Sequence, residues 1–264
     1  MTKNKLITKV FAGMSEFGDF VSPHPYDVDA EWAGGTWKQS LDWLRTGNLS
    51  VAATSDKLLE KFEGLELPTF RQEWFNEVDG SVPNVQAFIA GHPMSMRRRK
   101  RAESHSAPIT VFVDLFVSGG VSNEKILERG ALILSLVRIL ANHRPVQLYA
   151  ADATTSRSGV TVAQAVRIET APLDLARAAY ALCHSAFYRN LIISAERHIL
   201  SDTGDPLDKT KWTLSQIAAE MFGDGEQVLV IPAAMVTSTG SIDAKKWIED
   251  RIREAAPEIL AKAA

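Results

Sequence analysis

The sequence has little cysteine and no long apolar run, and both absences narrow the kind of protein it encodes. Its only cysteine is Cys183, so the chain forms no internal disulfide, and a reducing compartment such as the cytoplasm is expected. No apolar run is long enough to cross a bilayer, and the start of the chain lacks the apolar stretch of a signal peptide. We therefore expect a cytoplasmic protein that does not contact a membrane.

The common catalytic and cofactor motifs are also missing. Neither phosphate-binding pattern, GxxxxGK[ST] or GxGxxG, occurs. The six histidines show no metal-ligand spacing such as HExxH. Cys183 and His184 are adjacent, but neighbouring side chains on a helix point in different directions, so they form no catalytic dyad. We predict no catalytic residue, no cofactor and no metal, and a protein that is not an enzyme.

The clearest pattern in the chain lies between residues 108 and 153. A β-rich apolar run over 109–117 is followed by a break at 118–120 and by an apolar stripe at helical spacing. Ser122 is placed to cap that helix, which should end near Asn142, before Pro145. Residues 146–150 then form another strand. Strand, long helix and strand predict a crossover unit with parallel strands covered by helices.

The remaining chain divides into helical and extended stretches. Residues 1–30 read as irregular, Thr36 should cap a short helix closed by Gly47, and Asn48 should cap a second helix. Further strands are predicted over 160–168, 191–193 and 227–231. The predicted division is a helical or mixed N-terminal region (1–96), a basic flexible loop (97–107) and an α/β core (108–264). The fold class is α/β, with a central mixed or mostly parallel sheet flanked by helices.

The end of the first core strand resembles the von Willebrand factor A arrangement. Asp114 is followed by Leu115, Phe116 and Val117, then by Ser118 and two glycines before a helix. In that family, Asp and Ser residues at alternate positions after the first strand hold a divalent cation. Apolar residues occupy the intervening positions here and supply no ligand. The resemblance therefore implies a von Willebrand A-like strand–helix–strand core, without its metal.

Five consecutive cations form the sharpest local feature of the sequence: Arg97, Arg98, Arg99, Lys100 and Arg101. Residues 1–96 hold 8 Lys/Arg against 13 Asp/Glu, and residues 102–264 hold 16 against 19. The run is therefore a compact basic cluster on an acidic body, suited to phosphate oxygens. The alternative interpretation is a solvated loop, or a contact with the protein's own acidic surface.

Other residues outside this run are candidates for nucleic-acid contact. Arg157 lies in a polar loop, and Tyr188 with Arg189 offers a cation beside an aromatic ring. Tryptophans of the N-terminal third could stack on bases, although packing in a core is the alternative for each of them. No base-reading motif such as a helix-turn-helix or zinc finger is present. This combination predicts binding led by the phosphate backbone and tolerant of sequence.

Several phrases of the sequence resemble a family of phage proteins. They are Leu44-Arg45-Thr46-Gly47-Asn48, Val82-Pro83-Asn84-Val85 through Gly91-His92-Pro93-Met94-Ser95-Met96-Arg97-Arg98, Arg129-Gly130-Ala131, and Pro172-Leu173-Asp174-Leu175-Ala176. Together they are similar to small early proteins of podoviruses, and within that group to the Drc-type single-stranded-DNA-binding protein. The resemblance implies single-stranded-DNA binding, a role in replication or in bringing a phage RNA polymerase to opened promoters, and the host cytoplasm as location. We expect a homo-oligomer, because linked weak sites gain in effective concentration.

Two other classes of function remain open at this point. The first is a protein-interaction module on a von Willebrand A-like sheet, which binds a partner at the strand ends near residues 118–120 and 157–159. The second is an enzyme that uses the same strand-end cleft.

Overall fold

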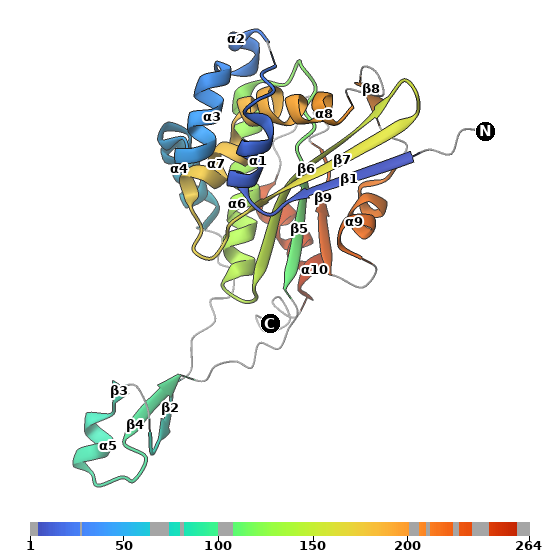
Figure 1. Ribbon diagram of the computed structural model, residues 1–264. Helices are drawn as coiled ribbons and strands as arrows, with labels where there is room; N and C mark the ends of the chain where they lie inside the picture. Colours follow the sequence, from blue (N-terminus) through green and yellow to red (C-terminus); the bar gives the residue numbers. More distant parts are fainter. Residues whose placement is uncertain are drawn as a thin grey trace. The chain divides into compact units, whose positions relative to one another are not determined.

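The computed structural model describes residues 5–26, 28–63, 74–79, 82–99, 108–200, 206–209, 212–223, 227–233 and 243–257 (Figure 1). The chain forms two compact units. The large unit comprises Met1–Leu65 and Ala107–Lys262, and the small unit comprises Glu66–Ser106. This division differs from the predicted boundaries of 96/97 and 107/108, because the first 65 residues fold with the C-terminal part of the chain.

The large unit contains a central sheet with helices packed against it. Its strands are β1 (Lys5–Phe11), β5 (Ile109–Asp114), β6 (Val146–Ser156), β7 (Val160–Ile168), β8 (Pro206–Lys209) and β9 (Val228–Ile231). Its helices are α1 (Met14–Val21), α2 (Ala30–Ala33), α3 (Trp37–Thr46), α4 (Leu49–Glu63), α6 (Asn123–Ala141), α7 (Leu175–Cys183), the π-helix η1 (Phe187–Ile192), α8 (Ile193–Ile199), α9 (Leu214–Phe222) and α10 (Ala244–Ala255).

The sheet is mixed and mostly parallel, as the sequence predicts. Its strand order is β1-β7-β6-β5-β9, and β8 pairs with β6 outside this path. The pairs β1/β7, β5/β6 and β5/β9 are parallel, whereas β6 runs antiparallel to both β7 and β8. The crossover β5-α6-β6 is therefore the parallel strand–helix–strand unit that the pattern over 108–153 indicates. It is followed by the β6–β7 hairpin.

Helix α6 forms where its apolar stripe predicts it. Ser122 is its N-cap residue and Asn142 its C-cap residue. Gly130 allows α6 to lie close against α7, because a Cβ at this position would stand 2.4 Å from the carbonyl oxygen of Leu182. The position thus requires glycine for space and not for backbone conformation.

Two local predictions are wrong. Residues 1–30 are not irregular, because β1 pairs with β7 along its whole length and α1 follows it. Residues 191–193 are helical and not extended, since they span the junction of η1 and α8. A short apolar run does not distinguish a strand from a buried helical segment, and only the packing partners decide.

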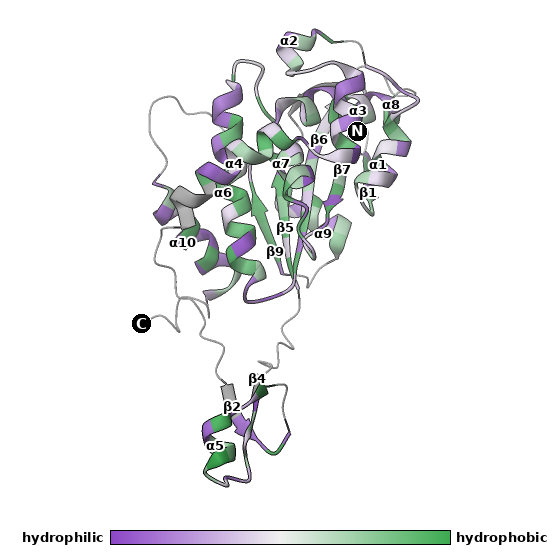
Figure 2. Ribbon diagram, turned by 90° about the vertical axis from the view of Figure 1, so that its left-hand side faces the viewer, coloured by the Kyte–Doolittle hydropathy of each residue, from purple (hydrophilic) through white to green (hydrophobic). Residues whose placement is uncertain are grey.

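The helices cover both faces of the sheet. Helices α6 and α7, together with η1 and α8, lie on one face, while α9 packs on the other (Figure 1). Strands β5 and β9 consist mostly of hydrophobic residues (Figure 2), as expected of strands covered on both sides. None of the described helices is long and apolar enough to cross a membrane.

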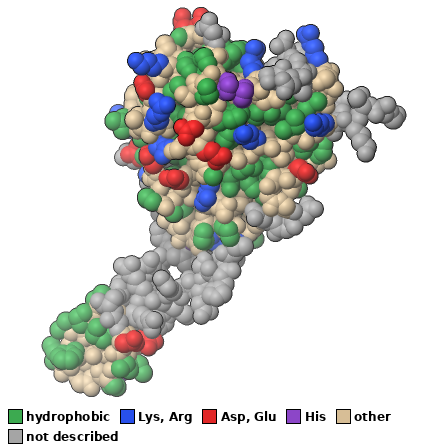
Figure 3. Space-filling view, in the orientation of Figure 1, with side chains coloured by type: hydrophobic (Ala, Val, Ile, Leu, Met, Phe, Trp, Pro, Cys, Tyr) green, Lys and Arg blue, Asp and Glu red, His purple; other side chains and the backbone are tan. Residues whose placement is uncertain are grey.

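The small unit is a three-stranded antiparallel sheet with one short helix. Its elements are β2 (Trp74–Glu77), β3 (Val82–Pro83), α5 (Val85–Ile89) and β4 (Met96–Arg99), and the strand order is β2-β4-β3. Asn84 caps α5 by accepting a hydrogen bond from the backbone amide of Ala87. Over 76–79 and 82–97, no described side chain of this unit is buried. Hydrophobic side chains gather on the face that Figure 3 shows.

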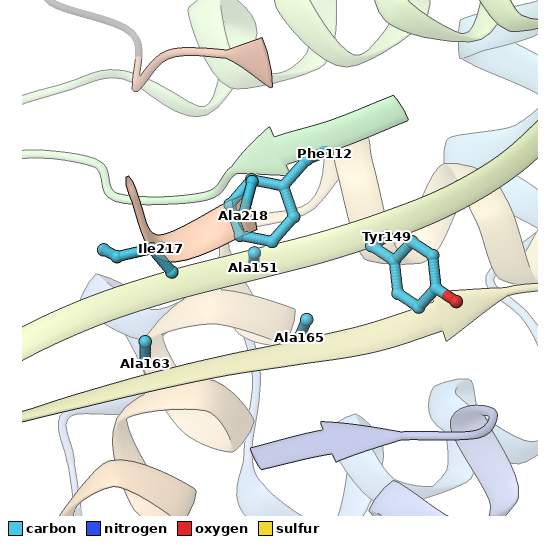
Figure 4. Packing of buried hydrophobic residues seen from close by; sticks show 7 residues of the cluster. All are labelled: Phe112, Tyr149, Ala151, Ala163, Ala165, Ile217 and Ala218. Carbon is cyan, nitrogen blue, oxygen red and sulfur yellow. The ribbon is translucent and has the colours of Figure 1, made fainter. Parts of the chain in front are cut away.

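The large unit, by contrast, has an extensive core on each face of its sheet. On the α9 face, Phe112, Tyr149 and Ala151 pack against Ile217 and Ala218 (Figure 4). On the opposite face, buried side chains of α6, α7 and η1 cover the strands.

Candidate nucleic-acid interface and buried carboxyl cluster

The basic run begins on the middle strand of the small sheet. Its first three arginines belong to β4 and not to the predicted loop. Backbone pairing with β2 and β3 makes this segment extended, and such pairing does not require buried side chains. Arg97 is exposed, and its ladder partners, Asn76 on β2 and Val82 on β3, are exposed too. Lys100 and Arg101, with the rest of the predicted loop to 107, lie outside the described residues. The pairing therefore presents Arg97 in the centre of an exposed row across three strands.

Apolar side chains of the small unit are exposed beside this row. On α5, Val85, Phe88 and Ile89 are 60, 72 and 79% exposed, and their spacing places them on one face of the helix. Val82 and Met94 add 42 and 46% exposed side chains. Residues 66–106 hold six Lys/Arg and five Asp/Glu, while the whole chain carries −3. The small unit thus combines apolar surface with the chain's densest positive charge.

The other predicted DNA contacts lie on the large unit, and two of them are buried. Arg157 is exposed in the β6–β7 turn, where Gly159 adopts a positive φ of 83°. Tyr188 and Arg189 are 9 and 4% exposed. The Arg189 guanidinium donates to the carbonyl oxygens of Trp32 and Val121 and lies 4.8 Å from the centre of the Trp32 ring. Its partners are internal, so it is not available to a phosphate.

Asp114 lies at the carboxyl end of β5, where parallel sheets usually carry their binding sites. Its carboxylate accepts a hydrogen bond of 2.9 Å from the backbone amide of Phe116. Arg129 donates to the carbonyl oxygens of Asp114 and Pro232, at 2.8 and 2.7 Å, and so ties the ends of β5 and β9 together. Burial lowers the pKa of Arg129 to about 10, so the guanidinium is charged at neutral pH. At this strand end the positive charge beside Asp114 is therefore Arg129 of the same chain, in the place where the von Willebrand A arrangement has a divalent cation.

A small cavity adjoins this strand end. It measures about 10 Å³ and is lined by residues of the 115–117 segment, α6, α7 and η1, among them Val117, Arg129 and His184. Burial lowers the pKa of His184, which favours the neutral imidazole. A cavity of this size holds about one water molecule.

Asp152 and Glu196 form a second polar cluster, which the sequence analysis missed. Asp152 on β6 is 3% exposed and Glu196 on α8 is 4% exposed, and their carboxyls are hydrogen-bonded to each other. Burial raises the pKa of Asp152 to about 7. Burial, the Asp152 charge and the hydrogen bond to Asp152 raise the pKa of Glu196. The available signal was a carboxylate directly after the apolar run 148–151.

The topology places the chain among α/β proteins whose mixed sheet is covered by helices on both faces. Comparison with known families then shows that the chain belongs to a family described as a domain of unknown function, DUF7192, whose model matches residues 2–219. The matched span includes the small unit and the large unit as far as α9. No curated protein and no solved structure matches the chain.

Proposed function

We propose that this protein binds single-stranded DNA without sequence preference, through residues 97–101 and the exposed surface of the small unit. The observation that carries this proposal is the exposed Arg97, on the middle strand of a sheet in which no described side chain is buried. A strand without buried side chains contributes little to a hydrophobic core, so the requirements of folding do not explain the run of five cations that begins on it. Phosphates are the groups that a dense row of Arg and Lys neutralises most favourably.

The exposed apolar side chains of α5 extend this proposal to the bases. Single-stranded nucleic acid presents anionic phosphates and planar apolar faces side by side, and proteins that bind it combine a cationic track with aromatic or apolar contacts. Phe88 is the most exposed phenylalanine among the residues whose side chains the structure describes and is the residue that we propose stacks on a base. A homo-oligomer would multiply the weak contacts of each small unit. Replication and the recruitment of a phage RNA polymerase in the host cytoplasm are the proposed settings.

Fluorescence anisotropy with a labelled oligothymidine tests the proposal. The test variant replaces Arg97, Arg98, Arg99, Lys100 and Arg101 by Ala. The matched control replaces five exposed cations of the large unit by Ala: Lys38, Arg45, Lys125, Lys245 and Lys246. If all five residues of the run neutralise phosphates, the association constant of the wild type should fall by about 3.5 log units per tenfold rise in salt. That slope corresponds to a loss of about 100-fold between 50 and 200 mM salt.

We expect the test variant to lose this salt dependence together with its affinity, and the control variant to retain both. Equal affinities of the wild type and the test variant would remove residues 97–101 from the mechanism. A duplex of the same sequence, bound as tightly as the single strand, would contradict the proposed strand preference.

A protein-interaction module is the second candidate, and the 60–79% exposure of the apolar side chains on α5 favours it. The exposed segments 118–120 and 157–159 of the large unit offer further contact surface. Apolar contacts are insensitive to salt, whereas contacts between cations and phosphates weaken as the salt concentration rises. A complex with a purified partner that survives high salt, formed by protein without affinity for single strands, would select this function.

A further inference from the structure

A group of buried oxygens lies between the sheet and the helices of the large unit. Asp152 on β6 stands opposite Gln164 on β7 in the antiparallel ladder. Glu196 projects from α8 and is hydrogen-bonded to both side chains. Gln164 is completely buried, and its Nε2 donates a 2.9 Å hydrogen bond to the carbonyl oxygen of Ile192, at the junction of η1 and α8. The cluster therefore joins two strands of the sheet to this helical segment.

The hydrogen bond between the two carboxyls requires a proton, because an ionised carboxylate only accepts. The bond therefore forms only while at least one of the two groups is protonated. The Ala153 amide donates to Asp152 and the Gln164 amide to Glu196, but Asp152 Oδ1 and Glu196 Oε1 meet no donor, so each carboxyl keeps an oxygen that no hydrogen bond would stabilise if both groups were ionised. The Asp114 charge adds to the repulsion felt by both groups.

A proton suits this site better than a metal ion. Within the described ranges, no group of three His, Cys, Asp or Glu side chains is arranged to hold a metal. The cavity at the end of β5 is lined by other residues and does not include Asp152, Gln164 or Glu196. Neutralisation by protonation needs no additional space, which explains how two acids fit into a packed layer.

The helical segment above the pair also binds the stretch between α1 and α3. Arg189 and Asn190 of η1 donate to the carbonyl oxygens of Trp32 and Gly35, the latter at 2.9 Å. Ser194 of α8 donates to the carbonyl oxygen of His24. A displacement of η1 and α8 would therefore be transmitted to residues 24–35.

We propose that Asp152 and Glu196 form a proton-linked latch, which holds η1 and α8 on the sheet while both carboxyls are protonated and loosens them when Asp152 loses its proton. The pKa values of both groups lie above those of ordinary carboxyls, so the folded state favours the protonated pair. Its contribution to stability is complete below the ordinary carboxyl pKa of about 4. It is lost as the pH rises through about 7, the pKa of Asp152.

The charged and titratable groups around the pair come from several elements. Asp114 acts from the end of β5, with Arg129 of α6 beside it. From η1, Tyr188 remains a neutral phenol because burial and the nearby carboxylates raise its pKa, while Arg189 is engaged by two carbonyls. On α8 itself, Arg197 and His198 stack on the rings of Tyr26 and His24.

The test combines a titration of the wild type with one variant and one control. Asp152→Asn keeps the shape and removes the ionisation, and Glu128→Gln does the same at an exposed site. Carboxyl carbon-13 resonances of the full chain are followed against pH. We expect a resonance missing from Asp152→Asn to titrate near pH 7, well above exposed carboxyls. We also expect the wild-type Tm to fall, between pH 5 and pH 8, by about 5 °C more than that of Asp152→Asn, with Glu128→Gln matching the wild type.

Amide hydrogen exchange, corrected for its intrinsic pH dependence, should be faster at pH 8 in η1 and α8 of the wild type than in Asp152→Asn. An Asp152 resonance that titrates near pH 4 in the wild type would overturn the proposal without any variant. Equal pH profiles of Tm for the wild type and Asp152→Asn would do so as well. So would a rise in wild-type Tm with Mg²⁺ or Ca²⁺ that Asp152→Asn abolishes, since a cation would then be the occupant.

Discussion

The two units of this protein use the same residue types in opposite ways. In the large unit, Phe187 and Arg189 are buried, the ring in the core and the guanidinium against two carbonyls. In the small unit, Phe88 is 72% exposed and Arg97 is exposed on the middle strand. The difference follows from size, since a segment as short as Glu66–Ser106 cannot bury enough surface to enclose its own side chains. The comparison shows that an arginine or an aromatic side chain indicates a binding site only where contacts within the fold do not bury or engage it.

The largest effect should come from removing the small unit altogether. Replacement of residues 66–106 by a Gly/Ser linker should abolish binding to oligothymidine in the anisotropy assay. The Tm of the remaining protein should stay within about 2 °C of the wild type, because the core of the large unit is untouched. A fall in Tm of about 10 °C or more would show that the small unit supports that core, and the contrast between the units would not hold.

A matched pair of phenylalanine variants sharpens the same contrast. Phe187→Ala should reduce the free energy of unfolding by about 3–5 kcal/mol, because it leaves a cavity in a packed core. Phe88→Ala should change it by no more than about 0.5 kcal/mol. Urea unfolding followed by circular dichroism measures both. Similar losses for the two variants would mean that Phe88 is covered in solution, and would remove it from the proposed base contact.

A matched pair of arginine variants gives the smallest effects. Arg189→Gln should destabilise the protein by about 2 kcal/mol, since it removes charge-assisted hydrogen bonds to carbonyls, and should leave DNA affinity unchanged. Arg97→Gln should be neutral for stability and should lower the salt slope of binding by about 0.7. Urea unfolding and anisotropy separate the two readouts. The reverse assignment, with Arg189→Gln weakening DNA binding in a stable protein, would restore the sequence-based prediction.

Local signals in the sequence predicted much of the large unit. The strand–helix–strand unit is confirmed, and so are the helix caps at Thr36 and Asn48, because a side-chain oxygen reaches an amide only three residues away. The partners of β1 were not predictable in this way, since its ladder joins residues 5–11 to residues 160–166. The strand over 96–99 was missed because its pairing, and not its composition, makes it extended.

The candidate sites differ in the same way, since some depend on neighbouring residues and others on contacts between distant segments. Residues 97–101 are found by counting charge along the chain, and the structure adds that the run begins in a strand. Tyr188 and Arg189 carried the same signal but are buried by contacts with residues more than 60 positions away, such as Val121. Asp152 and Glu196 are 44 positions apart and meet only because α8 packs against β7, the strand paired with β6.

By itself, the sequence determined the α/β class, the parallel crossover unit and the position of the cationic run, because periodicity, capping and charge act between neighbours in the chain. The tertiary structure alone decided which cations are exposed, which aromatic rings belong to the core and which two acids meet in the interior. Those outcomes depend on burial, and burial is set by segments that are distant in the sequence and adjacent in space.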